Sequence, residues 1–188
     1  MADLRLNMGC GYNKLDGWVN VDSSRACEPD VVHDLESLPW PWPDDSADRV
    51  RFFHSLEHMG RVPSVFLGMM QELYRVCRNG AEIEIAVPHP RHDNFLGDPT
   101  HVRIVTPNLL KLFDRQACDE VKRRGGSNTP FAHYLSVDFA ITSVTTALEE
   151  PYYTRYASKA LSDEDVERMS RELNNVVSEY RMLLVARK

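Results

Sequence analysis

The sequence of 188 residues predicts an α/β domain with a doubly wound, mostly parallel sheet and helices on both faces. Three features carry this prediction. Short apolar runs in the first half end at glycine or aspartate, an amphipathic helix lies between two such runs, and two long segments rich in Val, Thr, Leu and Tyr fill the last third. Strands that alternate with helical segments favour a parallel sheet covered on both faces. The long C-terminal pair can close one side of that sheet with at least one antiparallel strand.

Four short strands are expected in the first third of the chain, at residues 4–8, 19–22, 31–34 and 48–53. The first run alternates apolar and polar residues and stops at Gly9-Cys10-Gly11. The next two runs are β-branched and end in Asp22 and Asp34. The segment LPWPWPDDSADRV contains three alternating prolines, which exclude a helix and predict a loop before the fourth strand.

The clearest helix is expected from Pro63 to Cys77, where apolar residues recur with a period of 3.6 behind a proline. Arg78-Asn79-Gly80 is predicted to end it. A fifth strand is expected at residues 81–87, and a mobile loop at 122–130. Two long strands are expected at 136–148 and 175–186, with a charged helix between them at 162–173.

Composition narrows the class of protein. The length and the hydrophobic content of 43% fit one domain, residues 1–188, with a continuous core. The net charge of -6 disfavours nucleic acid as a partner. The four cysteines form no C-x-x-C pair, which argues against a zinc ribbon or a disulfide framework. With no apolar leader or membrane-spanning stretch in the sequence, we expect a cytoplasmic protein that does not enter membranes.

The glycine turn after the first strand fits two interpretations. Ligands of open parallel sheets bind outside the carboxyl ends of the strands, where glycine lets backbone N–H groups approach closely. A tight turn without a ligand would also need glycine. Asp22 and Asp34 favour the ligand, since a carboxylate at these strand ends can accept ribose hydroxyls or an adenine amino group. The alternative makes both ordinary turn acids.

The spacing disfavours NAD as the nucleotide. A dinucleotide fingerprint has a third glycine at the helix entry and an acid about 20 residues further on. Here Lys14 takes the third position, and Asp22 follows Gly11 too soon for a full crossover helix between them. The helix N-terminus that would hold a pyrophosphate is therefore poorly built.

With these residues in view, the chain resembles a class I S-adenosylmethionine-dependent methyltransferase over residues 4 to about 113. Five segments carry the resemblance. LNMGCG resembles the glycine-rich first motif, VNVD the segment with the ribose-binding acid, and HDLESLPWP the adenine-side loop. DRVRFFHSLEH resembles the fourth strand with its exit, and ELYRVCRNGAEIEIAVPH the helix, turn and fifth strand. The resemblance implies a seven-stranded sheet with an antiparallel C-terminal strand. It also implies a cofactor half, residues 1–88, and acceptor-side loops with the C-terminal strand pair, residues 89–188.

The resemblance also implies site residues and a reaction. The methionine part of S-adenosylmethionine would pack on the glycine turn, Asp22 would hold the ribose, and Asp34 with Leu35 would flank adenine. The implied cofactor-binding set is Asn7, Gly9, Cys10, Gly11, Asp22, Ser23, Asp34, Leu35 and His54. S-adenosylhomocysteine would be the product, and a small or medium-sized molecule with an oxygen or nitrogen nucleophile the acceptor. Asn7 stands where an acid is frequent in the family, and the connection from Gly11 to Val19 is unusually short.

The histidines supply candidates for the acceptor side. HSLEH, His54 to His58, spells an inverted zinc-protease motif, but it begins at a strand end, so its two rings need not converge, and we expect no metal. The loop after the fifth strand lies on the site rim and holds further polar residues. A general base is needed only for a hydroxyl or a protonated amine. The expected catalytic residues are His89 and His101, with His54 and His58 as rivals, and the expected substrate-side residues are His58, His92 and Arg103.

Two other classes of function remain open from the sequence. One is an oxidoreductase that binds NAD or a nucleotide sugar. The other is a catalytically silent subunit that binds cofactor and acts through a partner. FHSLEH stands where an Asn-Pro-Pro-Tyr motif would indicate amino-group acceptors in adenine, cytosine or glutamine, so these nitrogens are not favoured. The acceptor and the oligomeric state are not determined by the sequence.

Overall fold

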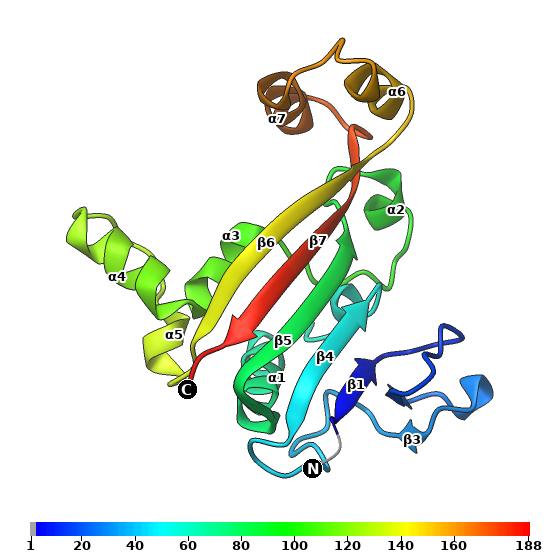
Figure 1. The fold of residues 1–188 in the computed structure, drawn as a ribbon, viewed down its shortest axis with the longest axis vertical. Helices are drawn as coiled ribbons and strands as arrows, with labels where there is room; N and C mark the ends of the chain where they lie inside the picture. Colours follow the sequence, from blue (N-terminus) through cyan, green and yellow to red (C-terminus); the bar gives the residue numbers. More distant parts are fainter. Residues whose placement is uncertain (1–2) are drawn as a thin grey trace.

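The computed structural model describes residues 3–188 as a seven-stranded sheet in the order β3-β2-β1-β4-β5-β7-β6 (Figure 1). The strands are β1 Arg5–Met8, β2 Val19–Asp22, β3 Val31–Val32, β4 Ala47–Phe53, β5 Cys77–Pro88, β6 Phe139–Leu148 and β7 Val177–Ala186. β7 pairs antiparallel with both β5 and β6, and the pairs among β1 to β5 are parallel. The predicted mostly parallel, seven-stranded sheet with an antiparallel C-terminal strand is confirmed.

The helices lie mainly in the connections after β4 and β5. The α-helices are α1 Pro63–Val76, α2 Asp93–Leu96, α3 Pro107–Leu110, α4 Arg115–Arg123, α5 Phe131–Tyr134, α6 Tyr152–Ala157 and α7 Asp163–Glu172, and the 3₁₀ turns are η1 Arg25–Cys27, η2 Leu56–His58 and η3 Lys111–Phe113. No helix of the described residues is long and apolar enough to cross a membrane.

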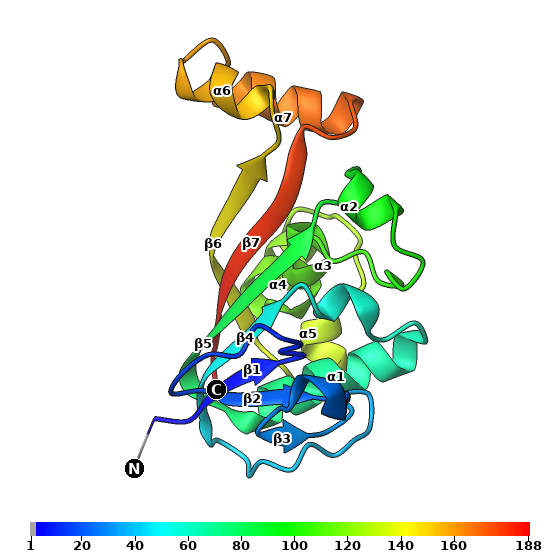
Figure 2. The ribbon, with the colours of Figure 1, turned by 90° about the vertical axis from the view of Figure 1, so that its right-hand side faces the viewer.

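Helical cover of the sheet is uneven. Phe66, Met69 and Leu73 of α1 belong to one buried cluster with strand residues such as Phe52 and Ile85. Figure 2 shows α1, α3, α4 and α5 on the same side of the sheet. The connections after β1, β2 and β3 contain no α-helix, so they supply no helical cover to the opposite face. That face carries cross-strand ion pairs instead, such as one of 3.0 Å between β4 and β5.

Several predicted boundaries differ from the structure; β6, for example, begins at Phe139 and not at Ser136. β3 ends at Val32 because Asp34 already belongs to a turn, in which its carboxylate accepts the backbone N–H of Glu36 at 2.9 Å. β5 begins directly after α1, and the predicted turn around Gly80 is an irregularity inside this strand. The last two residues of α4 fall within the loop predicted from Lys122.

The short helices α2 to α6 were not predicted, because helices this short carry too few apolar repeats to show a period. Capping residues were the available signal. Thr106 caps α3 just before a proline, and the side chain of Asp114 accepts the N–H of Ala117 at the start of α4. The predicted charged helix is confirmed as α7, and Ser162 forms a capping box with Asp165 at its start.

The β6 and β7 strands continue beyond the rest of the sheet as a two-stranded arm that carries α6 and α7 at its end (Figures 1 and 2). Most of β6 beyond Ile141 is exposed, whereas β7 alternates buried and partly buried residues. The arm begins where β7 pairs with the carboxyl end of β5, at Pro88 and Glu179. It therefore leaves the body at the edge where the parallel strands end.

Gly60 and Gly17 allow a matched test of packing. Both have positive φ, +68° and +76°, but a Cβ on Gly60 would lie 2.6 Å from Cβ of Phe66, whereas a Cβ on Gly17 would meet nothing within 4 Å. Gly17→Ala should cost about 1–2 kcal/mol for the left-handed backbone alone. Gly60→Ala should cost a further ~1–3 kcal/mol from overpacking. Urea unfolding of both variants measures the difference, and equal losses would contradict this account of Gly60.

Candidate functional site

The turn after β1 is bonded directly to the end of β2. The N–H of Gly11 donates to Oδ2 of Asp22 at 2.8 Å, and the N–H of Ser24 donates to Oδ1 of the same carboxylate at 2.8 Å. The backbone N–H of Cys10 also bonds to the carbonyl of Val21 at 2.9 Å. These bonds fix the Asp22 carboxylate at the carboxyl edge of the sheet, beside the glycine turn.

A cavity of about 210 Å³ opens at this edge. It is lined by Gly9, Asp22, Ser23, His33, Asp34, Leu35, Glu36, His58 and Met59. Its walls thus come from the ends of β1 and β2, the loop after β3, and the turn after β4. The structure brings together five predicted cofactor residues and adds His33, Glu36 and Met59. It also adds His58, which the sequence predicts on the substrate side.

The Asp34 carboxylate is also held by its own turn. It accepts the N–H of Glu36 at 2.9 Å and the hydroxyl of Ser37 at 3.3 Å. Asp34 is therefore a turn acid that also lines the cavity, and its contact with adenine stays a prediction. Glu36 accepts the N–H of Gly60 at 2.6 Å, which ties the loop after β3 to the segment after β4.

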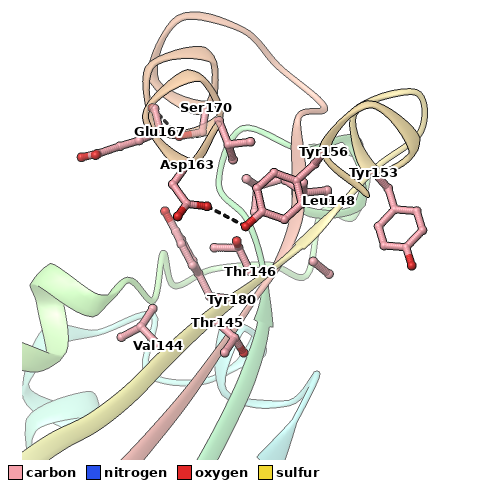
Figure 3. A pocket seen from close by; sticks show the side chains of 13 residues that line it. Val144, Thr145, Thr146, Leu148, Tyr153, Tyr156, Asp163, Glu167, Ser170 and Tyr180 are labelled. Atoms are coloured by element: carbon pink, nitrogen blue, oxygen red, sulfur yellow. Dashed lines mark hydrogen bonds between the residues drawn. The ribbon is translucent and has the colours of Figure 1, made fainter. Parts of the chain in front are cut away.

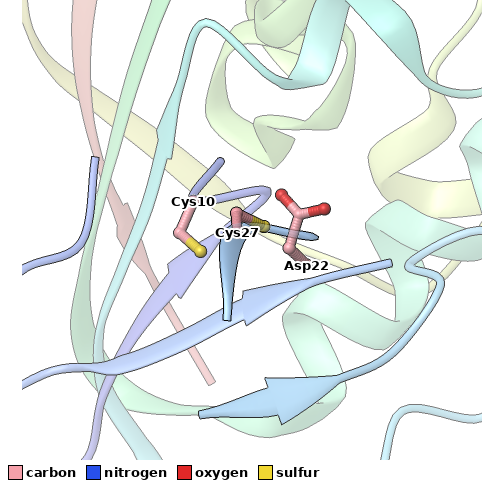
Figure 4. A group of neighbouring side chains, drawn as sticks. All are labelled: Cys10, Asp22 and Cys27. Carbon is pink, nitrogen blue, oxygen red and sulfur yellow. The ribbon is translucent and has the colours of Figure 1, made fainter. Parts of the chain in front are cut away.

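Cys10, Cys27 and Asp22 form a small cluster behind the glycine turn (Figure 4). Both thiols are buried, and the Cys10 Sγ donates to the carbonyl of Gly11 at 3.4 Å. Burial, followed by the nearby Asp22 carboxylate, raises the pKa of Cys10 to about 11. Cys10 is therefore a protonated packing group and not a nucleophile.

Asn7 is buried and its side chain organises the loop between β1 and β2. Its amide donates to the backbone carbonyl of Asn13 and to Oδ1 of Asn20, both at 3.0 Å. The Asn20 carbonyl oxygen also accepts the N–H of Leu15 at 2.8 Å. This network shows how the unusually short connection stays ordered without a helix. Both amide hydrogens of Asn7 are thereby used inside the protein.

His54 lies at the end of β4 in the left-handed backbone region, with φ +50°. Its Nε2 is 2.6 Å from Oε2 of Glu179 on β7, and its Nδ1 is 3.6 Å from Oε1 of Glu57. Glu57, followed by Glu179, raises the pKa of His54, although partial burial opposes this. Glu179 was not predicted as a site residue, because only the pairing of β7 with β5 brings it to this edge.

The histidines predicted after β5 have separate environments. The ring of His89 is buried against Tyr180, with ring centres 4.8 Å apart, and its Nδ1 accepts the N–H of Arg91 at 3.2 Å. His92 caps α2 through Nδ1, which accepts the N–H of Asn94 at 3.0 Å. The proton of neutral His89 therefore lies on Nε2, so this histidine presents a donor.

Arg103 and His101 lie closer to the turn after β4. The guanidinium of Arg103 donates to the carbonyl of Gly60 and stacks over the ring of Phe66 at 4.7 Å from its centre. Nδ1 of His101 is 3.0 Å from the carbonyl oxygen of Phe95, and its ring centre is 4.6 Å from that of His58. His101 is therefore the predicted rim histidine that lies beside the cavity wall.

A larger groove of about 740 Å³ lies on the arm, between β6 and the helices α6 and α7 (Figure 3). Tyr153, Tyr156 and Tyr180 contribute to its lining, and the hydroxyl of Tyr156 donates to Asp163 at 2.6 Å. It shares no lining residue with the 210 Å³ cavity. Its size and its place at the tip of the arm distinguish it from the site at the strand ends.

No protein-family model and no curated protein sequence matches the chain. Solved structures do match. One is a SAM dependent methyltransferase from Archaeoglobus fulgidus, with TM-score 0.66 and 22% identity over 97% of this chain and 86% of that chain. Another is a putative S-adenosylmethionine dependent methyltransferase from Listeria monocytogenes, with TM-score 0.57 and 12% identity over 99% and 92%. The chain thus has the class I methyltransferase fold, as its resemblance predicted.

The burial of His89 gives a pH prediction. Burial, followed by the positive charges of His92 and Arg91, lowers the pKa of His89 below its usual value of about 6.5. Between the folded and unfolded pKa values the unfolded chain binds more protons, so stability rises with pH through that window and is lost as pH falls. In His89→Asn, whose side-chain oxygen can accept the same N–H, urea unfolding between about pH 5 and 7 should show a shallower dependence on pH. An unchanged slope would contradict the assignment.

Proposed function

We propose that the chain binds S-adenosylmethionine in the 210 Å³ cavity and transfers its methyl group to a small or medium-sized acceptor through an oxygen or nitrogen nucleophile. The observation that carries the proposal is the convergence of the glycine turn, Asp22 and Asp34 on one cavity at the carboxyl edge of the sheet. The position is the one where open α/β sheets bind ligands, at the reversal of strand order on either side of β1.

The residues present fit the nucleoside part of this cofactor. Each Asp22 oxygen accepts one backbone N–H, which leaves lone pairs for ribose hydroxyls. A Cβ placed on Gly11 would meet nothing within 4 Å, so the backbone there is open to a ligand. The cavity is smaller than a typical ligand pocket of about 300–1,000 Å³, which suits the adenosine part, with the methionine part extending past the turn.

Bound S-adenosylmethionine supplies an activated methyl group. The protein's contribution to such a displacement is mainly alignment of the acceptor with that methyl. The His54–Glu179 pair lies at the same strand edge, and the carboxylate fixes the orientation of the imidazole at 2.6 Å. We infer that this pair and His101 face the acceptor. His89 presents an N–H, so we infer that it orients the acceptor and does not remove the acceptor's proton.

A second candidate function is a cofactor-binding subunit that acts through a partner. One matching structure, with TM-score 0.55 and 14% identity, is a complex between the Haloferax volcanii Trm112 methyltransferase activator and a putative methyltransferase. The arm with its helices α6 and α7, and the exposed face of β6, offer surface for such a contact. An active enzyme and a silent subunit share the cofactor cavity and differ only in whether an acceptor becomes methylated. The cytoplasmic location stays a prediction.

The first test compares ligands. S-adenosylhomocysteine should raise the melting temperature, because a ligand that binds only the folded state stabilises it by mass action, whereas NAD should not. Stabilisation by NAD alone would support the oxidoreductase and overturn the proposal. Transfer of labelled methyl from S-adenosylmethionine to a cell extract then separates an enzyme from a silent subunit.

The second test concerns Asp22. Asp22→Ala should weaken S-adenosylhomocysteine binding at least tenfold, since a hydrogen bond to a charged group contributes about 1.5–3 kcal/mol. Isothermal titration calorimetry measures the affinity, and circular dichroism checks that the fold survives. Asp16→Ala, at an exposed aspartate of the preceding loop, is the control and should bind normally. Retained affinity in Asp22→Ala would show that the ribose assignment is wrong.

A further inference from the structure

A second cluster of chemically active side chains adjoins the cofactor cavity. Glu57, His58 and His101 place one potential ligand atom each within 4.8 Å of the others. Glu57 and His58 belong to η2, directly after β4, and the backbone N–H groups of Val102 and Arg103 both donate to the Glu57 carbonyl at 2.9 Å. Those two bonds bring the loop that carries His101 against the turn after β4.

The carboxylate of Glu57 is the unusual member of this cluster. The residue is only 1% exposed, yet neither of its side-chain oxygens has a hydrogen-bond partner. The nearest basic side-chain atom, Nδ1 of His54, lies 3.6 Å away, beyond hydrogen-bond distance, and the same ring also contacts Glu179. A buried carboxylate without hydrogen bonds is costly, and coordination of a cation is a usual way of compensating it.

Hydrogen bonds fix both histidines in the form that binds metal. Nδ1 of His101 faces the carbonyl oxygen of Phe95, which only accepts, so this nitrogen carries the proton. Nδ1 of His58 is 2.9 Å from Oγ1 of Thr100, whose own hydroxyl donates to Asp98 at 2.6 Å. Thr100 therefore accepts from His58. In both rings the lone pair is left on Nε2, and outer partners of this kind orient metal-binding histidines.

We propose that Glu57, His58 and His101 form a binding site for a divalent first-row transition-metal cation beside the cofactor cavity. Coordination at about 2.0–2.2 Å places neighbouring ligand atoms roughly 3–3.5 Å apart, so ligand atoms that now lie up to 4.8 Å apart must close by as much as about 1.3–1.8 Å. His58 is exposed and can turn to do so. Three protein ligands leave a position open, as in catalytic zinc sites.

This site differs from the arrangement that the sequence suggested. The H-x-x-E-H motif of a zinc protease would use both of its histidines, but His54 turns to Glu179 and His58 turns to Thr100. The sequence did not require these two rings to converge, and in the structure they have separate partners. His101, 43 positions further along the chain, supplies the second imidazole, so the expectation of no metal is revised by our proposal.

The donor set selects the ion. Two imidazoles and one carboxylate suit Zn²⁺, Fe²⁺ and Co²⁺, whereas Mg²⁺ and Ca²⁺ prefer sites made of oxygen ligands. Cys10, Cys27 and Asp22 also come within 4.8 Å of one another. That group is the weaker candidate, because burial keeps the Cys10 thiol protonated and our proposed function already assigns the free lone pairs of Asp22 to the ribose.

The test is calorimetric titration of the full chain with Co²⁺ after treatment with a chelator. The native chain should bind one ion, and His58→Ala and His101→Ala should each raise the Kd at least tenfold. Thr100→Val, which keeps the shape but removes the acceptor for His58, should raise it tenfold or more, as loss of an outer partner does. His133→Ala, at an exposed histidine paired with Asp119, is the matched control and should bind normally.

Several outcomes would overturn the assignment. They are the absence of one-to-one Co²⁺ binding, unchanged binding in His58→Ala and His101→Ala, equally tight binding of Mg²⁺, and a thiolate-to-cobalt absorption band that is lost in Cys27→Ser. His58→Ala keeps the test valid if His101→Ala unfolds, since the His58 side chain is exposed. Cobalt binding is measured without S-adenosylmethionine or an acceptor, so its failure is distinguishable from failure of the proposed methyl transfer.

Discussion

The position of β1 between β2 and β4 is the constraint on which the rest of the molecule depends. Both neighbours pair with it in parallel, and Leu6 and Met8 are fully buried between them. Because the chain winds to one side of β1 and then to the other, the turns leaving the strands on its two sides diverge and open a crevice. The glycine turn, Asp22 and the turn after β4 all meet at that crevice.

The chain builds this site with little of the usual helical scaffold. The β1–β2 connection is held by the buried amides of Asn7 and Asn20 in place of a crossover helix. The ion pairs on the open face of β4 and β5 have the same origin, since no helix from the first three connections covers them. Most apolar cover is therefore on the side of α1, where Phe66, Met69 and Leu73 reach the sheet.

The edge that carries the cavity concentrates charge. Glu57 and Glu179 are both almost fully buried there, and His54 lies between them with a backbone conformation unfavourable for a side chain. Buried charges and strained backbone each lower the stability of the fold, and strained residues cluster at functional sites. A cofactor cavity and a cation site that share His58 would place two functions on one short turn after β4.

The sequence by itself determined the local elements and the part of the cavity wall that follows β1 and β2. Alternation, the proline-led helix and the glycine turn predict most strands, α1 and the meeting of the glycine turn and Asp22 at one edge of the sheet, since these depend on near neighbours and on one parallel register. Only the tertiary structure decided which distant residues meet. Antiparallel β7 brings Glu179 beside His54, and two backbone hydrogen bonds to Glu57 bring His101 beside His58. The reason is physical, because contacts between distant segments follow from packing and strand order, which leave no periodicity in the chain.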